Sequence, residues 1–309
     1  MGSSILAEGG GCRRLTDRNL LCFKQAGSQN SGNLLTVPIS VKSVNIFAVR
    51  HTSGATGGVL EQGYEIYSVS MPDKLADIVW SALTTGHEHL ALVHGGVRKY
   101  PANVAPFAAF AKGLAPEEAA TGLHALMQPG EMTHIIVEKE VIQLPGLSSE
   151  GALPTVQMIW PEDLAIPKPE TSAREIVPLT CDDAREMMEL IDIAFPGFFR
   201  IRTCAMGPYS GIRSARGNGK DAGKLIAMAG DRLVTDKLRE VSGVCTHPEQ
   251  TGKGLATQLI LHKLREHRER GYGSFLHAAA SNTRAIPIYE RLGFVHTRQF
   301  LLQRVRREA

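Results

Sequence analysis

The stretch EVSGVCTHPEQTGKGLA, residues 240–256, decides the fold because a strand ends in it and a glycine-containing turn opens a helix. Its first half is rich in β-prone residues, and the strand is expected to end near Thr246, since Pro248 fixes φ and lacks an N–H donor. From 253 to 271 apolar residues recur every three or four positions, which predicts an amphipathic helix with a glycine at its C-terminal end.

The turn between the strand and the helix suits a phosphate group. Gly252 and Gly254 flank Lys253, and their flexible backbones let successive N–H groups point at one ligand. The first-turn N–H groups of a helix lack intrahelical partners, and the helix dipole adds partial positive charge there. The spacing excludes a GxxxxGK[ST] phosphate loop, which requires glycine at His247, and GxGxxG is also absent. We therefore expect a pyrophosphate at this turn.

The turn resembles the Q/R-x-x-G-x-G/A segment of the GNAT superfamily, the CoA-dependent N-acetyltransferases, with Gly254 and Ala256 on the last two fixed positions. Thr251 stands at the Gln/Arg position and Gln250 lies one residue early, so the side-chain contact at that position departs from the family pattern. The alternative is an ordinary strand-to-helix turn. The resemblance implies that acetyl-CoA or another short acyl-CoA binds at Val244, Cys245, Thr246, Thr251, Gly252, Lys253, Gly254, Leu255, Ala256, Thr257, Asn282 and Tyr289.

A second segment, SNTRAIPIYERLGF, strengthens this resemblance. GNAT proteins commonly carry an asparagine, then a tyrosine several residues later, then a glycine and an aromatic residue, and this chain has Asn282, Tyr289, Gly293 and Phe294. The resemblance covers 170–309. It implies an α/β (α+β) fold with a mixed, mostly antiparallel sheet flanked by helices.

Within that family, the resemblance implies that an amine attacks the thioester carbonyl directly while both substrates are bound. Glu240 is expected to act as the general base and Tyr289 to protonate the leaving thiolate. The backbone N–H of Val244 is expected to stabilise the negative oxygen that develops during attack. Other readings remain open: Glu240 pairs with an arginine across the strands, Tyr289 is a core residue, and Asn282 only caps a helix.

The segment FFRIRTCAMGPYS follows a predicted helix and gathers aromatic and arginine side chains. It suits an acceptor pocket in which arginines pair with a carboxylate of the acceptor, or a loop that is merely anchored by its phenylalanines. The predicted acceptor-binding residues are Phe198, Phe199, Arg200, Arg202 and Tyr209. The sequence thus predicts an N-acyltransferase acting on a primary amine; the alternative is a non-catalytic sensor module that binds acyl-CoA.

A chain of 309 residues with 43% apolar composition is long enough for two domains. We expect a flexible leader at 1–35, an α/β domain at 36–165 and the N-acetyltransferase domain at 170–309. The order of elements is similar to that of two-part acyltransferases, including the glycine N-acyltransferase group. The resemblance implies that the domain at 36–165 is a degenerate, GNAT-like half without cofactor residues.

A net charge of +3 is close to balance, so no global field favours nucleic acid or an anionic membrane as a partner. No apolar run is long enough to span a membrane, and no signal peptide is visible. We expect a cytoplasmic enzyme with a small-molecule or peptide amine as its acceptor. The oligomeric state stays open.

A metal site is not expected. The five cysteines are odd in number, dispersed and never spaced as CxxC, which favours reduced thiols over a zinc cluster. Several histidines lie in the first half without an HxxxH pair, so surface or core positions explain them better than metal binding. These are His87, His89, His94 and His124.

Overall fold

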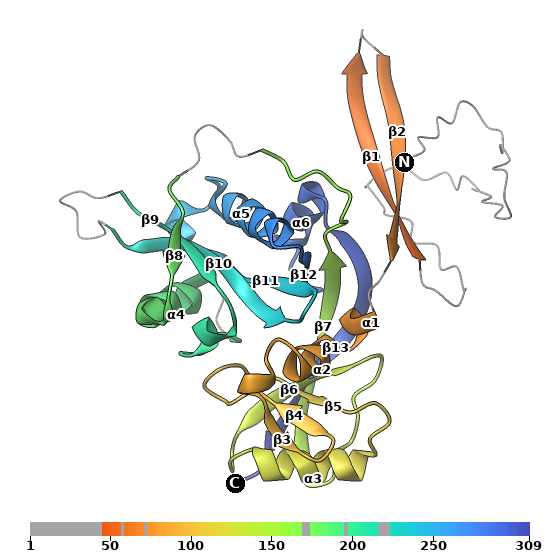
Figure 1. Ribbon diagram of the computed structural model, residues 1–309, viewed down its shortest axis with the longest axis vertical. Helices are drawn as coiled ribbons and strands as arrows, with labels where there is room; N and C mark the ends of the chain where they lie inside the picture. The colour runs from red at the N-terminus through yellow and green to blue at the C-terminus, as the bar shows by residue number, and fades with distance from the viewer. Residues whose placement is uncertain (1–44, 57–58, 71–72, 169–173, 195–196, 216–222) are drawn as a thin grey trace, which may run out of the picture. The chain divides into compact units, whose positions relative to one another are not determined.

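The chain is described here from a computed structural model, shown in Figure 1, in which two compact units divide between Met71 and Pro72. The predicted leader at 1–35 lies outside the described residues. The residues that the structure describes are 45–56, 59–70, 73–168, 174–194, 197–215 and 223–309.

The first unit contains a β-hairpin of strands β1 (Asn45–Thr56) and β2 (Val59–Ser70). The strands pair antiparallel without a register shift along their whole length. The sequence favoured a loop from His51 onward because of its glycines, and this expectation is wrong for 51–56, which belong to β1.

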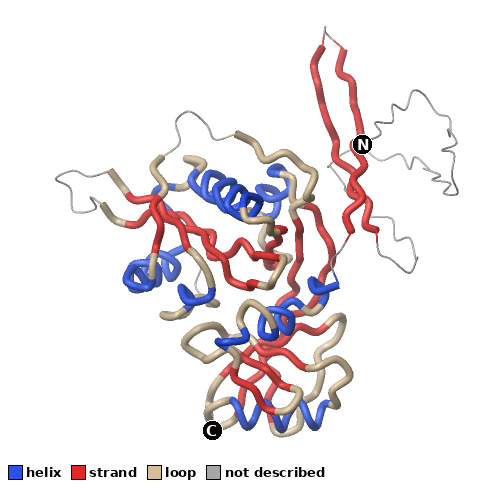
Figure 2. Tube along the Cα trace, in the orientation of Figure 1, coloured by secondary structure: helices blue, strands red, loops and turns tan. Residues whose placement is uncertain are grey.

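The second unit is built on an eight-stranded sheet in the order β6-β13-β7-β12-β11-β10-β9-β8 (Figures 1 and 2). Only β11 and β12 run parallel, and every other neighbouring pair is antiparallel. This confirms the predicted mixed, mostly antiparallel sheet. The strands are β6 (Met132–Val137), β7 (Leu147–Ile159), β8 (Val177–Leu179), β9 (Tyr209–Arg213), β10 (Leu225–Val234), β11 (Leu238–Thr246), β12 (Gly273–Ala279) and β13 (Val295–Arg307).

Helices cover both faces of this sheet. The α-helices are α1 (Asp73–Ala76), α2 (Ile78–Thr84), α3 (Pro116–Leu126), α4 (Ala184–Ala194), α5 (Leu255–Glu269) and α6 (Ile286–Leu292). Short 3-10 helices are η1 (Glu88–Leu90), η2 (Cys181–Asp183), η3 (Thr203–Met206) and η4 (Pro248–Gln250). No helix among the described residues has the length and apolarity of a membrane span.

Helix α4 lies on one face of the sheet, and α5 and α6 lie on the other (Figure 1). On the first face, Met187 and Leu190 of α4 pack in one core cluster with Cys245. On the opposite face, Ile260 of α5 packs in another cluster with Leu276. Each helix therefore buries the apolar stripe that its sequence period predicts.

The helix ends follow the predicted capping residues. Gly254 and Gly271 flank α5 with φ of 72° and 74°, in the left-handed region where glycine is least strained. The backbone N–H of Asp182 donates to the Thr180 hydroxyl before α4, at 3.2 Å. Pro287 within the helix expected at TRAIPIYERL predicts a bend, but this prediction is wrong, because the proline lies in the first turn of α6, where no N–H is needed.

A small antiparallel sheet of three strands replaces two predicted elements. The sequence NVAPFAAFAKG, 103–113, predicts a helix, and HLALVHGG, 89–96, predicts a buried strand. Both predictions are wrong: the first stretch contains a strand, and the side chains of the strand near 92 are exposed. Pro106 within 103–113 and Gly113 at its end favour a turn over a helix. The strands are β3 (Leu92–His94), β4 (Val97–Lys99) and β5 (Ala108–Phe110).

The large sheet continues across the predicted boundary at 165–170. Strand β7 lies before that boundary and pairs with both β12 and β13, so that Ile159 is opposite Phe275 on one side and Val295 on the other. Strands of the first half therefore complete the sheet of the second. That this first half is a degenerate copy of the fold stays a prediction.

Cys181 and Cys204 form a disulfide with Cα atoms 5.3 Å apart, so the expectation of reduced thiols is wrong for this pair. The two cysteines are 23 residues apart in the sequence and lie in η2 and η3. Cys245 is buried with a free thiol. The cytoplasmic location stays a prediction.

We predict that proteolytic cleavage within 161–168, between β7 and β8, does not release two separately folded halves. Strand β7 is hydrogen-bonded on both edges, so its removal exposes two unpaired strands. The two fragments should elute together in native size-exclusion chromatography and separate only in denaturant. Two folded fragments that elute apart would support the independent domains expected from the sequence.

Candidate functional site

Strands β11 and β12 diverge after a short paired stretch. They pair only from Leu238 opposite Gly273 to Glu240 opposite Phe275. Beyond that point β11 follows β10 and bulges between Ser242 and Cys245, where the register shifts. The strand edges that face each other beyond the fork have no strand partner, and a gap opens between them.

A cavity of about 480 Å³ occupies this gap. Its walls come from both diverging strands, from the first turn of α5 and from α6, and on the other face of the sheet from α2 and α4. The cavity therefore passes through the sheet. The predicted site residues that line it are Val244, Cys245, Thr246, Thr251, Gly252, Gly254, Leu255, Ala256, Thr257, Asn282, Tyr289 and Phe198.

The glycine turn leaves open space at one end of the cavity. A Cβ added at Gly252 or Gly254 would meet no atom within 4 Å. The first turn of α5 has no acidic residue and no side-chain cap, so its N–H groups are available to an anion. Lys253 does not line the cavity; its Nζ donates to the Gln250 side chain at 2.7 Å.

Tyr289 lies on α6 against Phe294, with ring centroids 6.0 Å apart. Burial raises the pKa of Tyr289 to about 12, so its hydroxyl stays protonated at neutral pH. Within the described residues no hydrogen bond engages this hydroxyl, and it can donate to a ligand. Asn282 lines the cavity and also accepts from the Ala285 N–H at 3.0 Å, so its capping role and its place in the site coexist.

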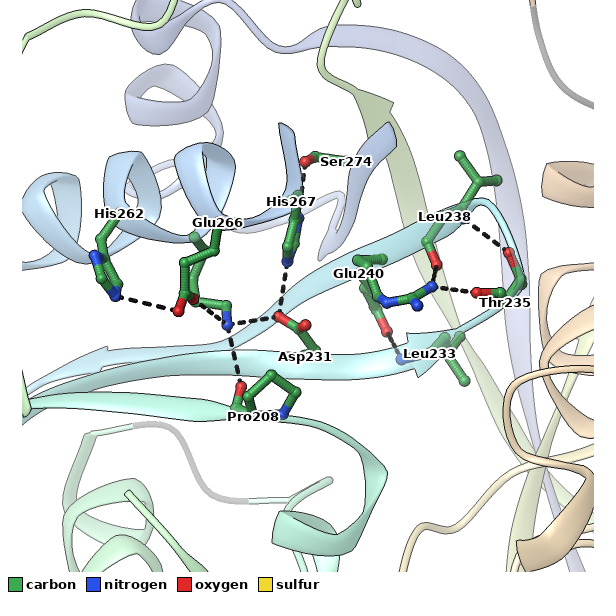
Figure 3. Close-up of polar contacts among 12 residues, drawn as sticks. Pro208, Asp231, Leu233, Thr235, Leu238, Glu240, His262, Glu266, His267 and Ser274 are labelled. Carbon is green, nitrogen blue, oxygen red and sulfur yellow. Dashed lines mark hydrogen bonds and ion pairs between the residues drawn. The ribbon is translucent and has the colours of Figure 1, made fainter. Parts of the chain in front are cut away.

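Glu240 is fully buried and does not line the cavity. Its carboxylate accepts from Arg232 Nε at 2.9 Å and Nη2 at 2.6 Å, and from the Leu233 N–H at 3.2 Å, the last contact being drawn in Figure 3. Burial acts to raise the pKa of Glu240, but Arg232 and a hydrogen bond from His277 outweigh it and hold the pKa at about 2. So low a pKa makes a poor general base. The geometry supports the ion-pair reading of Glu240.

His277 lines the cavity on β12, and its Nδ1 lies 2.9 Å from Glu240. Its Nε2 lies 2.9 Å from the side-chain nitrogen of Gln157. The Gln157 oxygen accepts from Thr297 and Arg298, both at 3.2 Å, which turns the amide NH₂ toward His277. His277 therefore accepts at Nε2 and donates at Nδ1 to Glu240, and burial lowers its pKa so that it is neutral. The sequence signal was a single titratable residue within the mostly apolar strand.

Of the five residues predicted to bind the acceptor, only Phe198 lines the cavity. Phe199 and Tyr209 pack edge to face at 5.6 Å in the core beneath α4. Arg200 donates to two carbonyl groups of its own loop, and Arg202 is exposed at the start of η3. The reading of this segment as a loop anchored by aromatic residues fits four of the five positions.

Other lining residues fall outside both motifs. At the glycine turn and α6 they include Gln250, Ile260, Arg284, Ala285 and Ile288. At the other end they include Val79, Phe107, Ile136, Leu153, Thr155, Ile191, Ala194, Arg232, Leu233, Phe300 and Leu302. Strand pairing assembles this second set from distant segments.

A second cavity, of about 190 Å³, lies between α5 and β10. Lys263 contacts Asp231 at 3.1 Å and Glu266 at 2.8 Å, and His267 lies between Asp231 and Ser274 (Figure 3). The buried charges satisfy one another, so this network holds α5 against the sheet. In the part of the chain that the structure describes, no group of three His, Cys, Asp or Glu residues is placed to hold a metal.

Comparisons with known proteins match the segment that contains the glycine turn and α6. The acetyltransferase (GNAT) family model matches residues 196–294. A crystal structure of a putative acetyltransferase of the GNAT family from Novosphingobium aromaticivorans is 33% identical over 76% of this chain and 98% of that one, with a TM-score of 0.66. A Drosophila protein at 16% identity, covering 68% and 73% of the two chains with a TM-score of 0.51, shares the fold. No curated protein matches the chain.

We predict that Glu240→Gln destabilises the protein by about 3 to 5 kcal/mol at neutral pH, because it leaves the largely buried Arg232 without its counter-charge. The pKa of Glu240 falls from 4.5 to about 2 on folding, so its stabilisation is complete above pH 4.5 and is lost as the pH falls toward 2. Urea unfolding at pH 7 and pH 3 measures both effects.

The exposed carboxylate of Glu138, which pairs with Arg298, provides the matched control. Glu138→Gln should lower the free energy of unfolding far less than Glu240→Gln, since solvent screens an exposed pair. Equal losses in the two variants would contradict a special role for the buried pair.

Proposed function

The chain belongs to the GNAT family of acetyltransferases, and from this we propose that it transfers an acetyl or other short acyl group from acyl-CoA to a primary amine. The observation that carries the proposal is the cavity between β11 and β12, which joins an anion-binding helix turn to Tyr289. Such a cavity admits the acyl donor and the acceptor together, so direct attack in a ternary complex is the proposed mechanism.

The donor end is assigned to the first turn of α5. The N–H groups around 252–256 suit the pyrophosphate of CoA, and the exposed Arg284 adds a cation at the cavity wall. The hydroxyl of Thr246 is buried on the wall without a hydrogen-bond partner among the described residues, so it can bond to the rest of the donor. These features fit acyl-CoA better than a nucleotide bound by a phosphate loop.

The proposed chemistry takes place at the fork of β11 and β12. The amine nitrogen attacks the thioester carbon. The N–H of Val244, which lies at the bulge of β11 beyond the point where β11 and β12 diverge, stabilises the oxyanion. Tyr289 then gives its proton to the departing sulfur. Burial raises the pKa of Tyr289 to about 12, so its hydroxyl holds its proton at neutral pH until the thiolate departs.

We predict that Gly254→Asp weakens acetyl-CoA binding at least about tenfold, because it places a negative charge beside the proposed phosphate site. Gly254→Asn is the matched control: it has nearly the same shape and tolerates the left-handed conformation, so binding should stay within about threefold of wild type. Isothermal titration measures both. If Asp and Asn weakened acetyl-CoA binding equally, backbone strain at position 254 would explain the loss, and the support for a phosphate at this turn would be removed.

We predict that Tyr289→Phe lowers kcat about 10²-fold while the Kd for acetyl-CoA changes little, because the proton reaches sulfur only as the C–S bond breaks. Thiol release from acetyl-CoA, followed with a panel of amines, gives kcat. Tyr272→Phe, in the second cavity, should leave kcat unchanged. Binding of acetyl-CoA without thiol release from the wild-type protein would favour the sensor over the enzyme.

A further inference from the structure

The end of the cavity away from the glycine turn has an apolar floor. On β13, Leu302 lies opposite Ile136 of β6 and Leu153 of β7, and all three line the cavity. Phe300, two residues earlier on the same strand, lines it as well. Residues two apart on a strand share a face, so these side chains form one continuous surface.

Aromatic side chains border this floor. The rings of Phe107 and Phe198 stack with centroids 5.9 Å apart and planes within 2° of parallel. His277 meets Phe300 edge to face at 5.3 Å. Flat rings in these arrangements favour a planar apolar group as the ligand.

The walls carry no negative charge. Among the described residues that line the cavity, the charged ones are Arg232 and Arg284, and none is an aspartate or glutamate. Arg232 lies over Phe107 at 4.9 Å and is neutralised by Glu240 behind it. An ammonium ion bound here would lose its hydration shell and gain no counter-charge, so the neutral amine is the form that binds.

The described residues of the walls also offer no free base. Both ring nitrogens of His277 are engaged, one by Glu240 and one by Gln157. Burial raises the pKa values of Tyr289 and Cys245 to about 12, so both are protonated at neutral pH and serve as acids or not at all. An alkyl amine with a pKa near that of lysine, about 10.4, is neutral in only about one molecule in 10³ at pH 7. The cavity therefore favours an acceptor that is neutral before it binds.

We infer that the acceptor is a weakly basic amine with an aromatic body, an arylamine in chemical class, and this inference rests on the proposed function. The aromatic ring lies on the apolar floor, and the nitrogen points to the fork of β11 and β12. The nitrogen forms the new N–C bond as the C–S bond breaks. Tyr289 protonates the sulfur, and the proton lost from nitrogen returns to Tyr289 through water, so thiol and amide are the products.

The test compares amines of matched size by thiol release from acetyl-CoA at pH 7. Aniline and benzylamine share a ring and differ in basicity, and ethanolamine is the polar control. We expect kcat/KM for aniline to exceed that for benzylamine at least about tenfold, with ethanolamine lowest. If kcat/KM for benzylamine or ethanolamine equals or exceeds that for aniline, the inference is overturned and the proposed function stands. If no thiol is released with any of these amines or with a wider amine panel, the proposed function is overturned together with the inference.

A charge placed on the wall gives a second measurement. Phe198→Glu supplies the missing carboxylate and should raise the benzylamine-to-aniline ratio of kcat/KM at least about tenfold, because an ammonium ion then gains a partner. Phe198→Gln introduces a side chain of nearly the same shape as glutamate but without the charge, and it should leave the ratio near that of wild type. Ile201→Glu puts the charge on an exposed position of the same loop and should also leave it unchanged. An unchanged ratio in Phe198→Glu overturns the inference.

Discussion

The site depends on one hydrogen-bonded chain of side chains at the fork of β11 and β12. Backbone pairing between the two strands stops at Glu240, and the side chains Arg232, Glu240, His277 and Gln157 continue across β10, β11, β12 and β7 from that point. Side-chain bonds thus replace ladder bonds where the strands separate. Glu240 and Gln157 are buried, whereas Arg232 and His277 line the cavity. The charges of Arg232 and Glu240 cancel, so the network spans the fork without leaving an unpaired charge beside the cavity.

The sequence predicted the parts of the site that are local. The strand, the glycine turn and α5 follow one another within 240–271, and capping residues and apolar period specify each of them. The same holds for α6, which carries Tyr289. Capping residues, apolar period and β-prone runs require no knowledge of which strands are neighbours. The mostly antiparallel sheet was instead implied by the resemblance to the GNAT family.

The other residues of the site are brought together by the packing and pairing of distant segments, which no local sequence pattern predicts. Phe198 and Phe199 are adjacent and chemically alike, yet one lines the cavity and the other packs beneath α4. For Glu240 the sequence left two readings open, a general base or a partner of an arginine across the strands, and only the structure shows it bound to Arg232 on the neighbouring strand of a hairpin. The apolar floor of the cavity joins β6, β7 and β13, whose register follows from pairs more than 130 residues apart in sequence.

The two ends of the cavity have different origins in the chain. The glycine turn and α6 lie within 196–294, the segment that the family model matches, whereas Ile136, Leu153 and Leu302 lie outside it. Donor binding needs backbone N–H groups at fixed spacing, which any residues of the right conformation supply. Acceptor binding needs the shape and charge of side chains. A chain that keeps the first requirement can therefore change its acceptor through β6, β7 and β13 without disturbing the fork at which we propose that the acyl group is transferred.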